Sequence, residues 1–305
     1  MFFLLLLDGY LGSLGFSLAR LTGLDLVEYE TKFFGDGEFY FRVKSNVVGK
    51  NVFVLLSMFP EPSFSVIRGL FFVNTLKDLG ASRVTLITPY LAYSRQDRRF
   101  LDGECVSSRV VVNSFLSVGA DYVVSIDVHN PNAFTDLGEK FVNLSSMPVI
   151  SQFIRENYSK SDVFLVSPDK GRVEYVKGIS DTIGVPFLYF KKRRDLRTGA
   201  IIKHEVSDES LFKQLINEKK VAIILDDIIS TGGTISNIAR TIRENGFTGD
   251  IVTVFTHGLF LPGSLVKLYK SGVTEVVSTD TVKNPFERIS VAPIIRDFIK
   301  RLENK

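Results

Sequence analysis

The chain has 305 residues, of which 45% are hydrophobic and 23% are charged, which suits two globular domains and excludes a disordered protein. Its net charge of +3 is too small to indicate nucleic acid as a partner, although it suits a small anionic substrate. The single cysteine, Cys105, excludes an internal disulfide and predicts a reducing, cytoplasmic compartment. No apolar stretch approaches the ~20 residues of a membrane span, so we expect no membrane partner.

Short apolar runs alternate with amphipathic stretches along the chain. The first run, MFFLLLL, lacks the basic start and the cleavage site of a signal peptide, so it predicts a buried strand. Amphipathic stretches at 65–80 and 234–246, each closed by a glycine, predict helices, and 291–305 predicts a last helix. This alternation argues for parallel sheets covered by helices. Further buried strands are predicted at 51–57, 83–90, 121–127, 162–168, 221–227, 250–258 and 275–280.

The sequence also repeats itself. Residues 51–90 parallel residues 220–258, and 118–131 parallel 271–285, which indicates a domain duplication. Only the first copy contains the insertion LAYSRQDRRFLDGECVSS, and only the second contains DDIISTGGT. The predicted division is a first domain at 1–145, joined by a terminal segment at 286–305, and a second domain at 146–285.

The stretch VAIILDDIISTGGTI combines two carboxylates with a loop of small residues. Glycines let the backbone approach a ligand, and the amides that begin the following helix attract anions. Carboxylates at the end of the strand can accept hydrogen bonds from sugar hydroxyls beside a bound phosphate. A helix cap after a core strand is the simpler interpretation, but the two aspartates favour a ribose 5-phosphate site. Its candidate residues are Asp226, Asp227, Ser230, Thr231, Gly232, Gly233 and Thr234.

The part ILDDIISTGGTI resembles the ribose-phosphate-binding motif of type I phosphoribosyltransferases and of ribose-phosphate pyrophosphokinase (PRPP synthetase). Five further motifs resemble those of the pyrophosphokinase family, in the family's order: FFGDGEFYFRV, PYLAYSRQDRRFLDGECVSSRVV, SIDVHNPNAF, LVSPDKGRVEYVK and FKKRRDLRTG. The resemblance implies an α/β fold of two tandem phosphoribosyltransferase type I-like domains, each a mainly parallel sheet flanked by helices. It also implies transfer of pyrophosphate from ATP to the C1 hydroxyl of ribose 5-phosphate, with Mg²⁺, giving PRPP and AMP.

The resemblance places the implied ATP-binding residues in two stretches of the first domain. In SRQDRR, arginines can hold phosphate through two hydrogen bonds at once, whereas a solvated basic loop is the simpler interpretation. In FGDGE, an aromatic ring beside carboxylates suits adenine, whereas a β-turn is the simpler interpretation. The family's FGDGE-like loop reaches a neighbouring subunit's ATP site, so a homo-oligomer is expected. The implied ATP-binding residues are Phe34, Asp36, Glu38, Arg95, Gln96 and Asp97.

Two residues that follow predicted strands, His129 and Asp169, are candidate metal ligands. A lone histidine is more often structural than a ligand, but the resemblance implies that both residues bind Mg²⁺ together with ATP. The run KKRRD is expected to lie on a loop, where a solvated charge run is its usual meaning. Cations that arrive when the site closes would stabilise the charge of a transferring phosphoryl group. The resemblance gives this catalytic role to Lys192 and Arg194.

Some positions depart from the family pattern. Gly35 stands where proline or serine is more frequent, and Ser230 stands where many members have aspartate. Near Asp169, where two glycines are usual, this chain has Lys170 and Arg172. The short connection after DVHNPNAF is similar to the archaeal-type branch, whose members often lack an allosteric phosphate and ADP site, so we expect none here.

Other functions explain only parts of the sequence. A phosphoribosyltransferase that consumes PRPP with a nucleobase would need no second domain with an ATP loop. A catalytically silent regulatory paralogue would have altered catalytic loops, whereas His129, Asp169, Lys192 and Arg194 are intact. A DNA-binding regulator would need an added recognition domain, for which the chain has no room.

Overall fold

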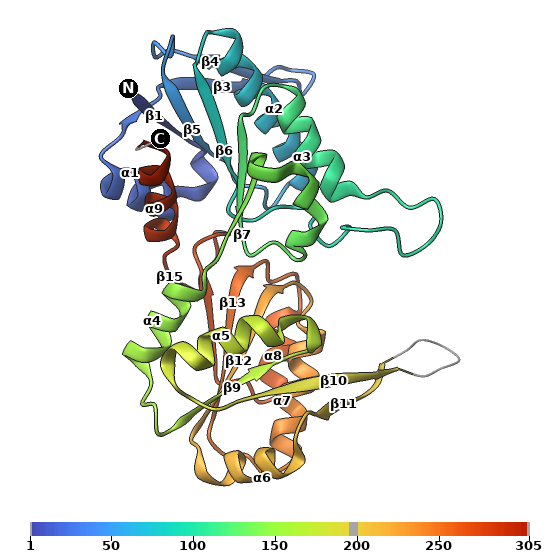
Figure 1. The fold of residues 1–305 in the computed structure, drawn as a ribbon. Helices are drawn as coiled ribbons and strands as arrows, with labels where there is room; N and C mark the ends of the chain where they lie inside the picture. The colour runs from blue at the N-terminus through green and yellow to red at the C-terminus, as the bar shows by residue number, and fades with distance from the viewer. Residues whose placement is uncertain (1, 195–200, 304–305) are drawn as a thin grey trace. The chain divides into compact units, whose positions relative to one another are not determined.

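The computed structural model describes residues 2–194 and 201–303, except for the side chains of 192–194 and 201–204. The chain forms two compact units (Figure 1). Each unit has its own parallel-dominated sheet with flanking helices, which confirms the expected fold class. In the described ranges, no helix is both long and apolar enough to cross a membrane. Unit 1 comprises Met1–Ser145, Asp280–Lys283 and Ser290–Lys305, and unit 2 comprises Ser146–Thr279 and Asn284–Ile289.

Unit 1 is built on a six-stranded sheet in the order β2-β1-β5-β6-β7-β8, in which every neighbouring pair runs parallel. Its central strands are continuous apolar runs because helices cover both of its faces. Strands β3 and β4 form a separate antiparallel hairpin. The strands are β1 (Phe3–Leu7), β2 (Asp25–Leu26), β3 (Tyr29–Phe33), β4 (Phe39–Val43), β5 (Asn51–Leu55), β6 (Arg83–Ile87), β7 (Tyr122–Ile126) and β8 (Phe141–Leu144).

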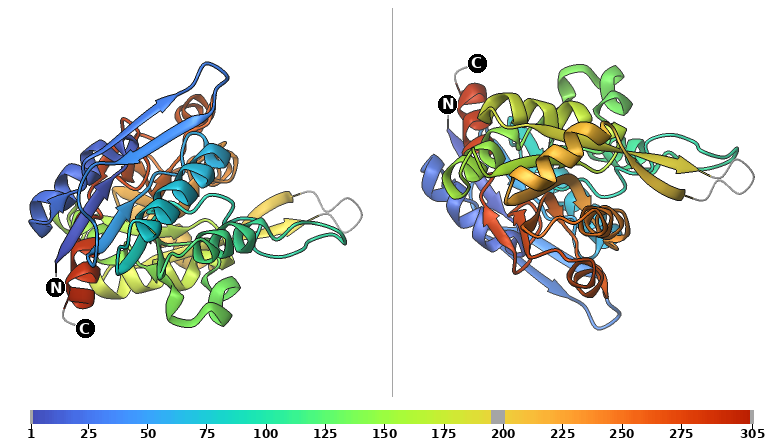
Figure 2. Two further views of the ribbon diagram at one scale, coloured as in Figure 1. Left: turned by 90° about the horizontal axis from the view of Figure 1, so that it is seen from above. Right: turned by 90° about the horizontal axis from the view of Figure 1, so that it is seen from below.

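Helices α2 and α3 lie on one side of this sheet, and α1 and α9 lie on the other (Figures 1 and 2). Phe72 of α2 and Phe115 of α3 share one buried cluster with Val52 and Val54, which are alternate residues of β5. The last helix, α9, packs against α1 near the start of the chain. The helices are α1 (Gly12–Thr22), α2 (Pro62–Asp78), α3 (Ser107–Ser117) and α9 (Ala292–Glu303), with 3-10 segments η1 (Gly9–Leu11) and η2 (Pro131–Lys140).

Unit 2 has a seven-stranded sheet in the order β11-β10-β9-β12-β13-β14-β15, parallel except for the pair β10 and β11. Strand β12 faces two cores: Ile224 packs with Ile238 of α7, whereas Ile223 packs with Ile154 of α4. The strands are β9 (Val163–Ser167), β10 (Phe187–Arg194), β11 (Ile201–Val206), β12 (Val221–Ile229), β13 (Asp250–Gly258), β14 (Glu275–Thr279) and β15 (Glu287–Ile289). The helical segments are α4 (Met147–Asn157), η3 (Lys170–Arg172), α5 (Val173–Ile183), α6 (Glu209–Glu218), α7 (Gly233–Glu244) and α8 (Ser264–Lys270).

Two expectations about local structure were wrong. Strand β12 continues to Ile229, still paired with β13, so Asp226 and Asp227 lie inside the strand and not at its last residues. The cationic run starts on a strand, because β10 extends through Arg194 and pairs with β11 as a hairpin arm. In both cases a neighbouring strand supplies backbone partners beyond the apolar run, and hydrophobic patterning does not reveal such partners.

Candidate functional site

The loop between β12 and α7 has the geometry of an anion cradle. Gly232 has a left-handed φ of +73°, and a Cβ there would lie 3.4 Å from the carbonyl oxygen of Ser264. At Gly233, the first residue of α7, the nearest atom to a Cβ would be Thr231 Oγ1 at 3.9 Å, so the approach to the helix is open. The N-cap residue of α7 is Gly232, and no side chain caps the helix. Its first backbone N–H groups are therefore available to an anion.

Two carboxylates precede this loop on β12. Asp227 is only 5% exposed, and its backbone N–H donates to Asp226 Oδ1 at 2.9 Å. Arg172 of η3 forms an ion pair with Asp227, and its Nε lies 4.0 Å from Asp226 Oδ1. Strand β9 ends just before η3 and is the neighbour of β12, so the parallel strands bring Arg172 to the carboxylates. The sequence showed Arg172 only as a departure from glycine, because it does not state which strands are neighbours.

Asp169 lies at the same edge of the unit 2 sheet. It begins η3, and its Oδ1 accepts a hydrogen bond from the backbone N–H of Gly171 at 3.0 Å. Its carbonyl oxygen accepts from Ser167 Oγ at 2.9 Å, which fixes the turn that follows β9. Asp169 thus follows β9, and Asp226 and Asp227 lie near the carboxyl end of the neighbouring strand β12, on the side of the sheet where ligands bind in open α/β folds.

In unit 1, the loop after β7 is joined to the SRQDRR insertion. Asn130 Nδ2 donates to Asp97 Oδ2 at 2.5 Å. The other carboxylate oxygen, Asp97 Oδ1, is buried and has no hydrogen-bond partner among the described residues. His129 is exposed at the end of the same loop, which begins with a left-handed φ of +41° at Asp127. The structure thus brings Asp97 to the segment that carries His129.

The SRQDRR segment is held to the start of α3 through its backbone. The carbonyl oxygen of Gln96 accepts hydrogen bonds from the N–H and the Oγ of Ser108, at 3.3 and 3.1 Å. The side chains of Arg95 and Gln96 are exposed. Burial raises the pKa of Tyr90, just before the segment, and the positive charge of Arg95 opposes this shift. The segment is therefore a fixed backbone that presents basic and amide groups to solvent.

The candidate residues Phe34, Asp36 and Glu38 form the tip of the β3–β4 hairpin. The N–H of Phe34 donates to the carbonyl oxygen of Glu38, and the N–H of Glu38 donates to Asp36 Oδ1. Gly37 has a φ of +92°, which the turn requires. The β-turn interpretation is correct, and the exposed ring of Phe34 lies beside Lys32, whose Nζ is 5.1 Å from its centroid. The tip belongs to a two-stranded sheet, which is separate from the six-stranded sheet that contains β7, the strand before His129.

Lys192 and Arg194 are backbone members of β10, paired with His204 and Ile201 of β11. The pairing shifts by a residue between Arg193 and Arg194. The side chains of Lys192 and Arg194 lie outside the described part of the structure, so their catalytic role stays a prediction.

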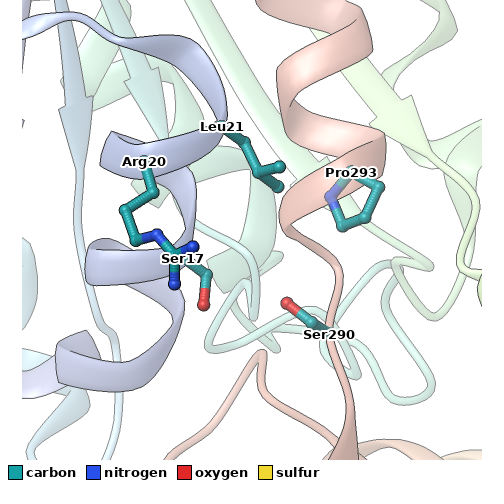
Figure 3. Close-up of a pocket in the computed structure, with 5 residues that line it drawn as sticks. All are labelled: Ser17, Arg20, Leu21, Ser290 and Pro293. Carbon is teal, nitrogen blue, oxygen red and sulfur yellow. The ribbon is translucent and has the colours of Figure 1, made fainter.

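Within the described residues, no group of three histidine, cysteine, aspartate or glutamate side chains forms a metal cage. A cavity of ≈ 290 Å³ lies between α1 and α9 of unit 1, and none of the candidate residues lines it. Figure 3 shows Arg20 and Leu21 of α1 on one side of it and Pro293 of α9 on the other.

Comparison with known families covers both units. Residues 12–119 match the family described as the N-terminal domain of ribose phosphate pyrophosphokinase, and residues 148–284 match the phosphoribosyl transferase domain.

Individual proteins and one solved structure are similar over nearly the whole chain. A ribose-phosphate pyrophosphokinase of Methanothermobacter thermautotrophicus is 36% identical over 93% of this chain and 95% of its own. One from Sulfurisphaera tokodaii is 32% identical over 91% of this chain and 92% of its own. The crystal structure of phosphoribosylpyrophosphate synthetase from Mycobacterium smegmatis is 27% identical, with a TM-score of 0.87 over 100% of both chains.

Proposed function

The chain belongs to the ribose-phosphate pyrophosphokinase family, and from this premise we infer the reaction and the residues that carry it out. The enzyme transfers the pyrophosphate group of ATP to the C1 hydroxyl of ribose 5-phosphate. The products are PRPP and AMP, and PRPP serves nucleotide biosynthesis. The observation that carries our proposal for the substrate site is the start of α7, which has no side-chain cap and follows β12, the strand of Asp226 and Asp227, after a three-residue loop.

The ribose 5-phosphate site is proposed in unit 2. The 5-phosphate would bind the free N–H groups at the start of α7 and the hydroxyls of Ser230, Thr231 and Thr234, because aligned amides and the helix dipole favour an anion there. The ribose hydroxyls would donate hydrogen bonds to Asp226 and Asp227, the carboxylates that precede the loop. Open space at Gly233 supports this arrangement, because a phosphate can reach the backbone there.

The ATP-binding residues are proposed in unit 1. Arg95 and Gln96 are exposed and would hold phosphate or ribose groups of ATP. The buried oxygen Asp97 Oδ1 would accept a hydrogen bond from ATP or from a water bound with it, which would satisfy an otherwise costly buried carboxylate oxygen. Phe34, Asp36 and Glu38 would meet the adenine of a neighbouring subunit's ATP, since an aromatic face and carboxylates suit its ring and exocyclic amine. This arrangement requires a homo-oligomer, and a monomer with full activity would contradict it.

Mg²⁺ is the proposed cofactor, with His129 and Asp169 as its protein ligands. Mg²⁺ usually takes one or two protein ligands, keeps several waters and binds the phosphates of its nucleotide, so a complete protein cage is not required. Asp169 suits this role because one carboxylate oxygen is fixed by Gly171, which orients the group. When bound, the ion would neutralise charge on the phosphates of ATP.

The transfer itself would need no covalent enzyme intermediate. The C1 hydroxyl would attack the β-phosphorus in line with the leaving oxygen of AMP, and positioning with charge stabilisation would supply most of the catalysis. Lys192 and Arg194 would stabilise the negative charge that spreads over the transferring group. We also propose a cytoplasmic location, which the single free cysteine supports.

One assay tests the proposed reaction. The protein is incubated with ATP labelled at the β-phosphorus, Mg²⁺ and ribose 5-phosphate, and the nucleotides and sugar phosphates are separated. The label should appear in PRPP, with one AMP formed for each PRPP and none without ribose 5-phosphate. Formation of ADP, or an intact ATP pool, would contradict the proposal.

A further inference from the structure

Arg172 occupies an unusual position beside the proposed ribose 5-phosphate site. It forms ion pairs with both carboxylates of β12, with Asp227 directly and with Asp226 at 4.0 Å. Its side chain is only 13% exposed, and its guanidinium lies 5.9 Å from the ring centroid of Tyr175. The Tyr175 hydroxyl is in turn hydrogen-bonded to Ser146 Oγ at 2.8 Å. Arg172 is therefore positioned by the ring of Tyr175 as well as by the two carboxylates.

Two adjacent carboxylates need such a cation for an electrostatic reason. Like charges a few ångströms apart oppose the ionisation of both groups, and a nearby cation favours it. A phosphorylated sugar brings further negative charge to the same site. The guanidinium is a planar fork with several donors, so it can meet both carboxylates at once and still leave their other oxygens to a ligand.

Unit 1 offers an internal comparison, because β1 and β5 occupy the places that β9 and β12 occupy in unit 2. There the charges are interchanged: Asp8 follows β1, and Arg68 of α2 pairs with it at 2.8 Å. Arg68 Nη2 also donates to the carbonyl oxygen of Ser57 at 3.0 Å, and both charged side chains are at most 5% exposed. The pair in unit 1 thus links the end of β1 to α2 and to the segment after β5, whereas in unit 2 Arg172, just after β9, pairs with Asp227 inside β12.

We propose that Arg172 is a positioning residue for ribose 5-phosphate, which it affects through Asp227 without contacting the substrate. It holds Asp226 and Asp227 in place as hydrogen-bond acceptors, and its positive charge lowers the repulsion between them and the incoming phosphate. This inference rests on the proposed function of the two carboxylates. Under this proposal Arg172 contributes to the affinity for ribose 5-phosphate and contributes little to the rate of the chemical step.

The first test compares affinity with turnover. Arg172→Gln should raise the KM for ribose 5-phosphate by about 10- to 100-fold, by analogy with the loss of a residue that orients a metal ligand. Its kcat should stay within a few-fold, and its KM for ATP should not change. Arg172→Lys should show a smaller rise, because it keeps the charge but loses the fork. Lys177→Gln is the matched control, since it removes an exposed cation from the adjacent helix α5 and should leave both KM values unchanged.

A double-mutant cycle then separates an indirect effect from a direct contact. If Arg172 acts through Asp227, adding Arg172→Gln to Asp227→Asn should change the ribose 5-phosphate affinity much less than it does alone. Multiplicative effects would show that Arg172 touches the substrate independently and would overturn the proposal. A lower KM in Arg172→Gln would also overturn it, because Arg172 would then compete with the sugar for the carboxylates.

The binding of ribose 5-phosphate is also measured directly by calorimetry, with and without Mg²⁺ and a non-hydrolysable ATP analogue. If the wild-type protein binds the sugar phosphate but forms no PRPP, the proposed reaction is wrong, and the ratio of Kd values still tests Arg172. If PRPP forms normally and Arg172→Gln and Arg172→Lys both bind as tightly as wild type, the reaction stands and the positioning role fails. Should Arg172→Gln not fold, the Lys variant alone carries this comparison.

Discussion

Asn130 donates a hydrogen bond from Nδ2 to Asp97 Oδ2 across 2.5 Å, joining the loop after β7 to the insertion before α3. Asn130 also caps η2, because its Oδ1 accepts a hydrogen bond from the N–H of Asn132 at 3.2 Å. Asn130 thus links the proposed ATP-binding residue Asp97 to the loop of the proposed metal ligand His129. Asn130 itself is proposed to bind neither ATP nor the metal.

This coupling predicts a selective effect on ATP. Asn130→Asp keeps the oxygen that caps η2 but replaces the donor to Asp97 with a second carboxylate. Because a hydrogen bond to a charged group contributes ~1.5–3 kcal/mol, the KM for ATP should rise about tenfold or more. The KM for ribose 5-phosphate should stay unchanged in the same steady-state measurements. Asn132→Asp adds the same charge at an exposed neighbouring position and should behave as wild type; equal effects in the two variants would refute the coupling.

Alanine substitutions at Gly232 and Gly233 should have different effects, the first on stability and the second on ribose 5-phosphate binding. Gly232→Ala should lower the free energy of unfolding by ~1–2 kcal/mol, because an L side chain is strained in the left-handed conformation. Gly233→Ala should leave the Tm nearly unchanged, since a Cβ there has open space, but should raise the Kd for ribose 5-phosphate about tenfold. Thermal unfolding and calorimetry measure the two effects. If Gly233→Ala binds ribose 5-phosphate normally, the phosphate does not contact these amides.

The proposed metal ligands can be tested without disturbing the local fold. Asp169→Asn keeps an oxygen to accept the N–H of Gly171 but removes the charge. It should raise the Mg²⁺ concentration for half-maximal activity about tenfold, and His129→Ala should have the same direction of effect. Removal of Mg²⁺ by a chelator should abolish activity in every variant. Binding of ribose 5-phosphate should be nearly intact in both, and a wild-type Mg²⁺ dependence would exclude these residues from the metal site.

The cationic strand should matter for turnover more than for binding. Lys192→Ala and Arg194→Ala should each lower kcat by roughly 10²–10³-fold, because each removes a charge that stabilises the transition state. Their KM values should change far less, and the double variant should lose less than the product of the single effects. Lys191→Ala and Arg193→Ala are the matched controls. If Lys192→Ala and Arg194→Ala keep kcat within a few-fold of wild type, the two controls become the candidates.

The buried pair in unit 1 predicts a pH-dependent stability effect. Burial raises the pKa of Asp8, and the charge of Arg68 opposes this shift. Arg68→Met leaves an uncompensated buried carboxylate and should lower the free energy of unfolding by about 3–5 kcal/mol at neutral pH. A carboxyl with a raised folded-state pKa favours folding at low pH and loses this contribution as pH rises through that pKa, so the loss should shrink toward acidic pH.

The control for this effect is Arg109→Met, which breaks an exposed pair with Asp136. It should change stability little at any pH, because solvent screens the pair. Denaturant unfolding across the pH range measures both variants. A loss from Arg68→Met that does not depend on pH would mean that lost packing, and not the charge of Asp8, causes it.

The features that could be predicted from sequence are those carried by neighbouring residues. Apolar runs of six to nine residues predicted the more buried strands β1, β5, β6, β7, β9, β12, β13 and β14, because burial on both faces selects continuous apolar side chains. The remaining strands, β2, β3, β4, β8, β10, β11 and β15, were not predicted. The repeat and the motifs predicted two similar α/β domains, and Gly232 marked a loop in which the chain adopts a positive φ. The sites built on these motifs remain proposals, and the strand positions of Asp226, Asp227 and the cationic run differ from what the sequence predicted.

The pairings between distant residues emerged only in the folded chain. The residues around Arg172 in the sequence do not predict its ion pair with Asp227. This contact exists because β9 lies beside β12, and the sequence of neither strand determines which strand is its neighbour. The same holds for Asn130 with Asp97 and for the two extra residues of β12, which exist as strand because β13 continues beside them. Hydrophobic patterning reports whether a residue is buried, whereas a polar contact requires a partner at a set distance and direction, and only tertiary packing supplies that partner.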